Sequence, residues 1–191
     1  MILAALLLLA GAAGGEQVVD WRSVATPADR ERLRHWRDDW QRSLAAARAG
    51  GDGAALAADP ALFSPDAALD EPALPVGPYR CRVVKFAGAH LAEGAWGRCV
   101  IAAAGEGRRR LERGEGNQRF SGAIYPDASH RSIFLGAMAY PGERHPLPYG
   151  RAAGRDMIGL VERIGAQRWR VVLPSPRYES QLDLLELAPA P

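Results

Sequence analysis

The chain has 191 residues, a formal net charge of +2 and 48% hydrophobic residues, which is typical of one globular domain with an ordinary core. The small net charge gives no electrostatic case for a nucleic-acid-binding protein or for general attraction to anionic lipid. Two cysteines and four scattered histidines do not have the spacing of a zinc site. We therefore expect no metal, no cofactor and no nucleic-acid partner.

The first residues read MILAALLLLAGAAGGEQ. The apolar run from Met1 to Ala10 is too short to span a bilayer comfortably, but it fits the hydrophobic part of a secretory signal. The small residues that follow, up to Gly15, are typical of a cleavage zone. The sequence therefore predicts a signal peptide over residues 1–15, no transmembrane span in the mature chain, and a location in the periplasm or outside the cell.

An amphipathic helix is predicted next. Thr26 is a good N-cap and Pro27 suits the first helical position. Gly50 and Gly51 end the pattern. Between them, apolar residues recur every three or four positions and form one stripe, which consists of Leu33, Trp36, Trp40, Leu44 and Ala47. We expect a helical segment and a proline-rich connector over residues 16–75, with a short helix near 54–58 or 60–63.

An antiparallel β domain is predicted over residues 76–189. Apolar and polar residues alternate there, and short turns with Gly, Pro or Asp join most segments, as in a meander. Even spacing favours a barrel or a strongly coiled sheet, since closure removes exposed edges. The fold class is therefore α+β, with the helix packed on the barrel. The eight predicted strands are 79–87, 96–103, 108–113, 118–125, 132–139, 157–163, 169–173 and 181–187.

Cys81 and Cys99 lie in the first two predicted strands. If these strands pair about a centre near His90, the two cysteines face each other. Cysteines directly opposite on antiparallel strands can approach disulfide distance, and exported proteins commonly contain disulfides. We therefore predict a Cys81–Cys99 disulfide.

Ser121, Asp127 and His130 are the residue types of a hydrolase triad and fall within ten residues. Pro126 and Asp127 favour a turn, which leaves Asp127 and His130 at a hairpin tip. Ser121 then lies more than about 10 Å down the strand, at roughly 3.3 Å per residue. Because a nucleophile and its base need hydrogen-bond contact, we predict a hairpin here and assign no catalytic residues.

Glu162 lies within the apolar strand DMIGLVERIG. If Ile158, Leu160 and Ile164 point into the core, so does Glu162, and a buried carboxylate needs a partner. Three interpretations are open: a structural ion pair, a polar anchor at the barrel mouth, or the centre of an enzyme. The candidate partners are Arg119, Arg155, Arg168 and Arg170.

Arginines and aromatics at one barrel end suggest a grip for an anionic or planar ligand. The alternative is that these residues simply face solvent. The segment GEGRRRLERGEGNQR is also basic, but interleaved glutamates favour a solvated hairpin. With Arg170 as a further member of the set, the candidate ligand-binding residues are Tyr79, Arg80, Arg119, Tyr125, Glu162 and Trp169.

Several segments together carry a family resemblance. They are WRSVATPADRERLRHWRDDW, YRCRVVK, GNQRFSGAIYPD, RSIFLGA, RDMIGLVERIGAQRWRVVLPSP and ESQLDLLEL. In this order they resemble exported alphaproteobacterial proteins known as domain of unknown function 4893, over roughly Val18 to Pro189. The resemblance implies export and a fold type, and it brings no catalytic residues.

The sequence supports three functional hypotheses. The first is an exported, non-enzymatic binding protein that holds a small ligand or an envelope protein at the barrel interior or rim. The second is an envelope interaction or structural protein. The third is an enzyme built around Glu162 and a neighbouring arginine.

Overall fold

The computed structural model describes residues 19–116, 118–177 and 180–190. The predicted signal peptide therefore lies outside the described residues. The helices are α1 (Trp21–Val24), α2 (Pro27–Arg34), α3 (Trp36–Ala49), α4 (Gly53–Ala58) and α5 (Pro60–Phe63). The strands are β1 (Gly77–Ala87), β2 (His90–Glu93), β3 (Gly97–Ala103), β4 (Arg109–Arg113), β5 (Phe120–Ala128), β6 (Arg131–Met138), β7 (Asp156–Gly165), β8 (Arg168–Pro174) and β9 (Leu182–Pro189).

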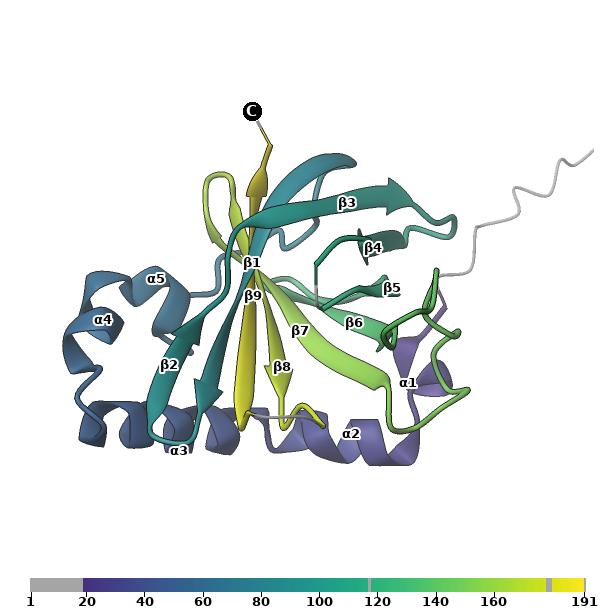
Figure 1. Ribbon diagram of the computed structural model, residues 1–191. Helices are drawn as coiled ribbons and strands as arrows, with labels where there is room; N and C mark the ends of the chain where they lie inside the picture. Colours follow the sequence, from purple (N-terminus) through teal and green to yellow (C-terminus); the bar gives the residue numbers. More distant parts are fainter. Residues whose placement is uncertain (1–18, 117, 178–179, 191) are drawn as a thin grey trace, which may run out of the picture.

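The strands form a closed antiparallel barrel (Figure 1). Neighbours follow the order β2-β1-β3-β4-β5-β6-β7-β8-β9, and β1 pairs with β9 to close eight strands. The predicted α+β fold is therefore confirmed, with a barrel as the sheet form. The extra strand β2 was not predicted, because His90–Glu93 is short and mostly exposed and shows no alternation.

The barrel interior is filled by side chains. Gly122 and Gly136 lie opposite each other on β5 and β6, and a Cβ at either would come within 2.6 Å of the ring of Phe134. These glycines therefore make room for that ring. The buried cluster of the interior comprises Leu74, Tyr79, Cys81, Val83, Cys99, Ile101, Leu111, Phe120, Ile124, Phe134, Val161, Trp169, Val171, Leu173, Leu185 and Leu187.

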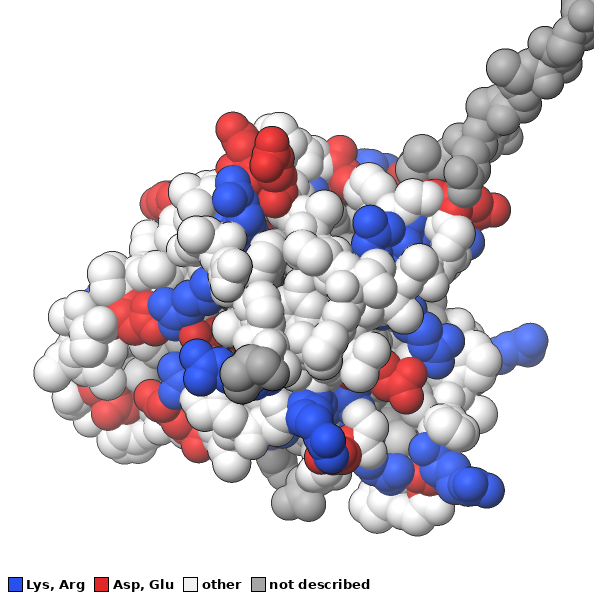
Figure 2. Space-filling model, turned by 90° about the horizontal axis from the view of Figure 1, so that it is seen from above, with Lys and Arg blue, Asp and Glu red and all other residues white. Residues whose placement is uncertain are grey.

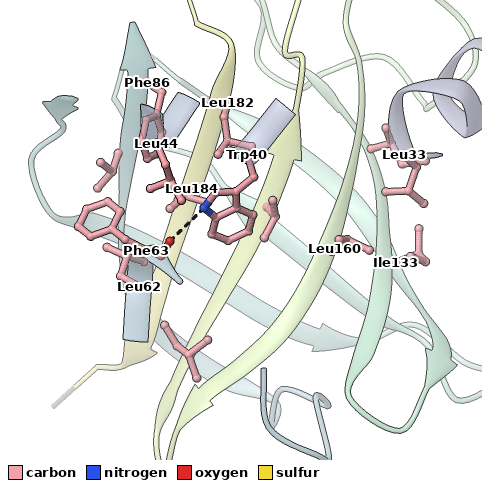
Figure 3. Packing of buried hydrophobic residues seen from close by; sticks show 14 of the residues in the cluster. Leu33, Trp40, Leu44, Leu62, Phe63, Phe86, Ile133, Leu160, Leu182 and Leu184 are labelled. Atoms are coloured by element: carbon pink, nitrogen blue, oxygen red, sulfur yellow. Dashed lines mark hydrogen bonds between the residues drawn. The ribbon is translucent and has the colours of Figure 1, made fainter. Parts of the chain in front are cut away.

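The helices cover the outer face of the barrel on one side (Figure 1). Trp40 of α3 is fully buried there, and its indole Nε1 donates to the carbonyl of Phe63 at 3.0 Å (Figure 3). Ile158, Leu160 and Ile164 are buried as predicted, but they pack in this outer layer with Trp40 rather than in the barrel interior. The protein thus has two apolar layers that share one sheet.

The predicted long helix is interrupted. Thr26 caps α2 as predicted, since its hydroxyl accepts from the amide of Asp29 at 3.2 Å. At His35 the chain leaves helical geometry, and its amide donates to the carbonyl of Arg32, three residues back, at 3.2 Å. This tighter bond separates α2 from α3 while both keep their apolar side on the barrel. Both short helices near 54–58 and 60–63 are present as α4 and α5.

The proline-rich connector closes one end of the barrel. Leu74 belongs to the interior cluster and is 1% exposed. Backbone bonds hold the connector in place: the amide of Leu69 donates to the carbonyl of Arg163 at 2.8 Å. In addition, the hydroxyl of Tyr79 donates to the carbonyl of Pro75 at 2.9 Å. The interior is therefore covered at the end where β1 begins.

A disulfide joins Cys81 and Cys99, with their Cα atoms 5.9 Å apart. The predicted register was wrong by two residues, because Tyr79 pairs with Cys99 and Cys81 pairs with Gly97. The cysteines are diagonal neighbours on one face of the sheet. The shift arises in the hairpin turn, which lies at Gly88 and Ala89 instead of at His90, since Ala87 already pairs with His90.

Removal of this disulfide should lower stability. The bridge closes a loop with a sequence separation of 18, for which the chain-entropy model gives about 3 kcal/mol. The double variant Cys81→Ala, Cys99→Ala should show that loss in guanidinium chloride unfolding without reductant. Two reactive thiols in the unreduced wild-type protein would contradict the bridge.

Candidate functional site

The barrel is open at the end opposite the connector. An open cavity of about 720 Å³ lies there, within the range of small-molecule sites. Strand ends contribute three of its lining residues, since Lys85 lies near the end of β1, Arg113 ends β4 and Met138 ends β6. The segments between strands supply the others. We call it the mouth cavity. Its lining residues are Lys85, Gly94, Ala95, Arg113, Gly116, Gln118, Met138, Ala139, Tyr140 and Pro141.

Strand alternation positions the side chains of the mouth cavity. Val83 and Leu111 both belong to the interior cluster. Lys85 lies two residues beyond Val83, and Arg113 lies two residues beyond Leu111. Residues two apart on a strand share a face. The inward-facing rows of β1 and β4 therefore each place a cation, Lys85 or Arg113, at the mouth.

Arg113 is half-buried and has no hydrogen bond or ion pair to any residue that the structure describes. Its Nε is fully buried without a partner. Its Nη2 lies beside two glycines. A Cβ added at Gly97 would lie 3.3 Å from this Nη2, and a Cβ added at Gly116 would lie 3.7 Å from it. Burial lowers the pKa of its guanidinium, although an arginine stays charged at neutral pH.

A second, smaller cavity of about 40 Å³ shares Met138 with the mouth cavity. Met157, Leu173 and Pro174 supply much of its apolar wall. Asp156 and Asp183 also line it, and burial raises the pKa of Asp156. The mouth of the barrel thus combines one cationic region with an adjoining, more apolar one.

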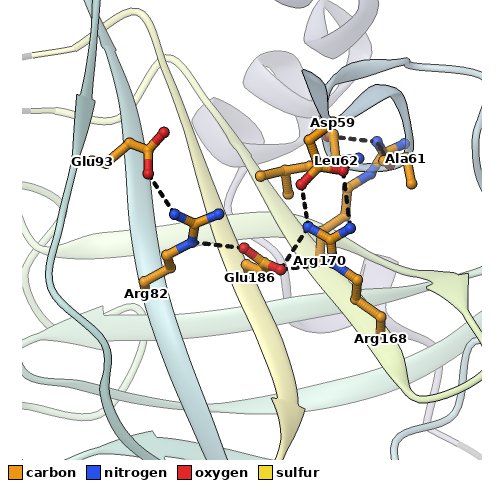
Figure 4. A network of polar contacts seen from close by, with 8 residues as sticks. All are labelled: Asp59, Ala61, Leu62, Arg82, Glu93, Arg168, Arg170 and Glu186. Atoms are coloured by element: carbon orange, nitrogen blue, oxygen red, sulfur yellow. Dashed lines mark hydrogen bonds and ion pairs between the residues drawn. The ribbon is translucent and has the colours of Figure 1, made fainter. Parts of the chain in front are cut away.

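Glu162 is paired with Arg170 beneath the helices. The two residues are direct cross-strand neighbours on β7 and β8, and Arg170 Nε donates to Glu162 Oε2 at 2.8 Å. The guanidinium of Arg170 also donates to the carbonyls of Leu62 and Ser64 at 2.8 and 2.7 Å, and lies 4.4 Å from the ring centroid of Trp40. This arginine fixes the turn around α5 to the barrel (Figure 4).

A chain of ion pairs starts at Arg168 on the same strand, β8. Arg168 donates to both Asp59 and Glu186. Glu186 also accepts from Arg82 at 2.7 Å, and Arg82 in turn pairs with Glu93 (Figure 4). Burial alone would raise the pKa of Asp59, but its hydrogen bonds from Arg168 and Leu62 hold it below its ordinary value. The network links the helical layer to β1, β8 and β9, so its role in the described geometry is structural.

The candidate ligand-binding residues do not lie together. Tyr79 and Trp169 touch inside the barrel, with ring centroids 6.0 Å apart. Arg80 lies over the exposed ring of Trp96 at 4.7 Å. Arg119 donates to the carbonyls of Tyr140 and Glu143.

The other two candidates lie in the outer layer. Tyr125 is buried, with Arg108 5.6 Å from its ring centroid, and Glu162 is held by Arg170. The ligand-binding role of the six residues stays a prediction. The sequence analysis did not identify Arg113 and Lys85 as site residues. The segment RRRLER did contain a signal for Arg113, because an inward-facing Leu111 implies that Arg113, two residues later on the strand, also faces inward.

The hairpin of β5 and β6 is confirmed, with Ser121 paired to Ala137 away from the tip. Asp127 serves to hold the N-terminal helix. It accepts from the indole of Trp21 at 2.8 Å and from Arg131 at 3.0 Å, and Arg22 lies at 3.1 Å. Burial would raise the pKa of Asp127, but these bonds and charges keep it below its ordinary value.

The family model of a domain of unknown function, DUF4893, matches residues 21–187. The chain belongs to this family. No curated protein matches the chain. In the ranges that the structure covers, no helix is long and apolar enough to cross a membrane. Within the same ranges, no cluster of three or more His, Cys, Asp or Glu side chains is suited to a metal ion.

Truncation of Arg170 should destabilise the protein strongly. Arg170→Ala leaves Glu162 buried and unpaired, and breaking a buried pair costs about 3–5 kcal/mol. Arg98→Ala is the matched control, because Arg98 is exposed and pairs with Glu115 at the surface, where such pairs contribute little. Urea unfolding of both variants measures the difference, and equal stabilities would contradict the structural role.

Asp127 should contribute to the acid sensitivity of the fold. Because the folded pKa is lowered, its stabilisation is complete above the unfolded value of roughly 4 and is lost as pH falls through the folded pKa. Asp127→Asn should therefore have a lower melting temperature than wild type at pH 7. The difference in melting temperature between the two proteins should be smaller near pH 2.5. A gap that is the same at both pH values would contradict the role of the ionised carboxylate.

Proposed function

We propose that this protein is an exported, non-enzymatic binding protein of the periplasm or the extracellular space, which holds a small ligand at the open mouth of its barrel. The observation that supports this proposal most is the mouth cavity of about 720 Å³. It is large enough for a small molecule. Three of its lining residues, Lys85, Arg113 and Met138, lie on paired strands, which are rigid elements.

Export is supported by two features. The first is the predicted signal peptide over residues 1–15, in which an apolar run is followed by small residues, as in the hydrophobic region and cleavage zone of a secretory signal. The second is the Cys81–Cys99 disulfide, because such bridges persist in oxidising compartments and are rare in the cytosol.

The rim is favoured over the barrel interior as the place of binding. Both ring pairs of the interior, Tyr79 with Trp169 and Phe120 with Phe134, are in contact, and the connector covers the far end through Leu74. A ligand in the interior would have to displace packed side chains. The mouth cavity needs no such displacement.

The enzyme hypothesis is weaker than the binding hypothesis. The carboxylate of Glu162 is 3% exposed and is engaged by Arg170, and neither cavity at the barrel mouth is lined by it. A general acid or base needs contact with its substrate. The burial of Glu162 therefore favours the structural ion pair among its three interpretations.

The envelope-interaction hypothesis draws on the side of the protein away from the helices. Figure 2 shows that uncharged atoms occupy the centre of this side, with both signs of charge around it. Val100 of β3 and Val76 before β1 are 51% and 57% exposed. Single exposed apolar residues are ordinary on protein surfaces, so this observation favours a partner less than the cavity favours a ligand.

Blocking the mouth cavity should abolish probe binding. The neutral fluorophore N-phenyl-1-naphthylamine should bind the wild-type protein saturably with one site. Ala95→Trp should reduce this binding at least tenfold, because Ala95 is exposed at the cavity wall and an indole there fills the space.

Ala55→Trp on α4 is the matched control and should bind the probe like wild type, since Ala55 is exposed away from the cavity lining. Circular dichroism of both variants checks the fold. A probe that does not saturate, or that binds equally to the two variants, would contradict a ligand site at the mouth.

A further inference from the structure

We propose that the mouth cavity selects an anionic ligand, a small molecule with one carboxylate or phosphate group on an apolar body, and that Arg113 binds the anionic group. This inference rests on the proposed function, since it assigns the ligand class of the same cavity.

The charge of the cavity wall is one-sided. Lys85 and Arg113 are its two cations, and no Asp or Glu is among its described lining residues. Lys85 already has a partner. The uncompensated charge of the described wall is therefore that of Arg113.

The acidic residues nearest to Arg113 in sequence are engaged elsewhere. Glu112 lies 3.5 Å from Arg110, and Glu115 pairs with Arg98 at 2.7 Å. Glu112 is also on the other face of β4, because adjacent strand residues point to opposite faces. Neither glutamate neutralises the guanidinium at the mouth.

An unpaired, half-buried arginine is unusual. A buried charge without a partner destabilises a fold, and several other arginines of this protein pair with carboxylates, such as Arg155 with Glu143 at 2.6 Å. The guanidinium presents a planar fork of donors that matches carboxylate and phosphate oxygens. A bound anion would supply the partner that the described chain does not.

The rest of the lining indicates an apolar body for the ligand. Ala95, Met138, Ala139 and Pro141 line the same cavity as Arg113. Beyond Met138, the smaller cavity continues with Met157 and Leu173. An anion with a short alkyl chain fits both the charge and the lining.

The test is calorimetric titration of octanoate, octyl phosphate and neutral 1-octanol into the full-length protein. At least one of the two anions should bind the wild type at least tenfold more tightly than octanol. Arg113→Gln should lose this preference. Arg110→Gln should keep it, because Arg110 is exposed on the outer face of the same strand.

Thermal melting of Arg113→Gln separates binding from folding. The variant should melt no lower than wild type, because Arg113 makes no hydrogen bond or ion pair within the described chain. If Arg113→Gln melts lower, Arg113 has a structural role and the inference is overturned.

Two further outcomes would also overturn the inference: equal binding of octanol and both anions by wild type, or an anion preference that survives in Arg113→Gln. Both leave the proposed function standing if the neutral fluorophore still binds and Ala95→Trp still blocks it. Failure of that fluorophore experiment instead removes the proposed function itself.

Discussion

The pairing of β1 with β9 is the constraint on which the rest of the structure depends. It runs from Tyr79 opposite Pro189 to Phe86 opposite Leu182 and closes the sheet on itself. Closure divides the side chains of every strand into an inner and an outer row. The inner row makes a packed interior stapled by the Cys81–Cys99 disulfide. The outer row is apolar on one side and requires the helical layer that carries Trp40.

Arginine is used in two different ways along these rows. Arg82 and Glu186 are direct neighbours across the closing pair, and Arg170 is surrounded by a carboxylate, carbonyls and the ring of Trp40. These charges are compensated, so they fix the geometry of the layers. Arg113 has the same chemistry without described partners, and it faces the mouth cavity. This contrast is the physical basis for assigning the mouth, and not the buried network, as the place of binding.

Much of the architecture was predictable because it follows from local patterns. Thr26 and Pro27 predict the start of a helix, and the alternation of apolar and polar residues predicts the strands of the barrel. Tertiary contacts produce the break at His35 and the short strand β2. The two-residue error in the register of Cys81 comes from the hairpin turn, which lies at Gly88 and Ala89 and not at His90. Single-sequence patterns do not encode these.

The site was less predictable for the same reason. Alternation shows which residues share a face, but not which face lies inside the barrel or beneath the helices. Glu162 was therefore correctly expected to be buried with an arginine, and its place beneath the helices was missed. Arg113 was grouped with a solvated basic hairpin, since only the closed barrel shows that its row leads into the mouth.

The most direct test of the account is native mass spectrometry of the full-length protein, expressed with export and purified without reductant. The account predicts a chain lacking its first residues, two hydrogen masses lighter than the reduced form, with a small anionic molecule bound non-covalently. A reduced, uncleaved chain that carries no added mass, even after incubation with octanoate or octyl phosphate, would contradict both the compartment and the binding function.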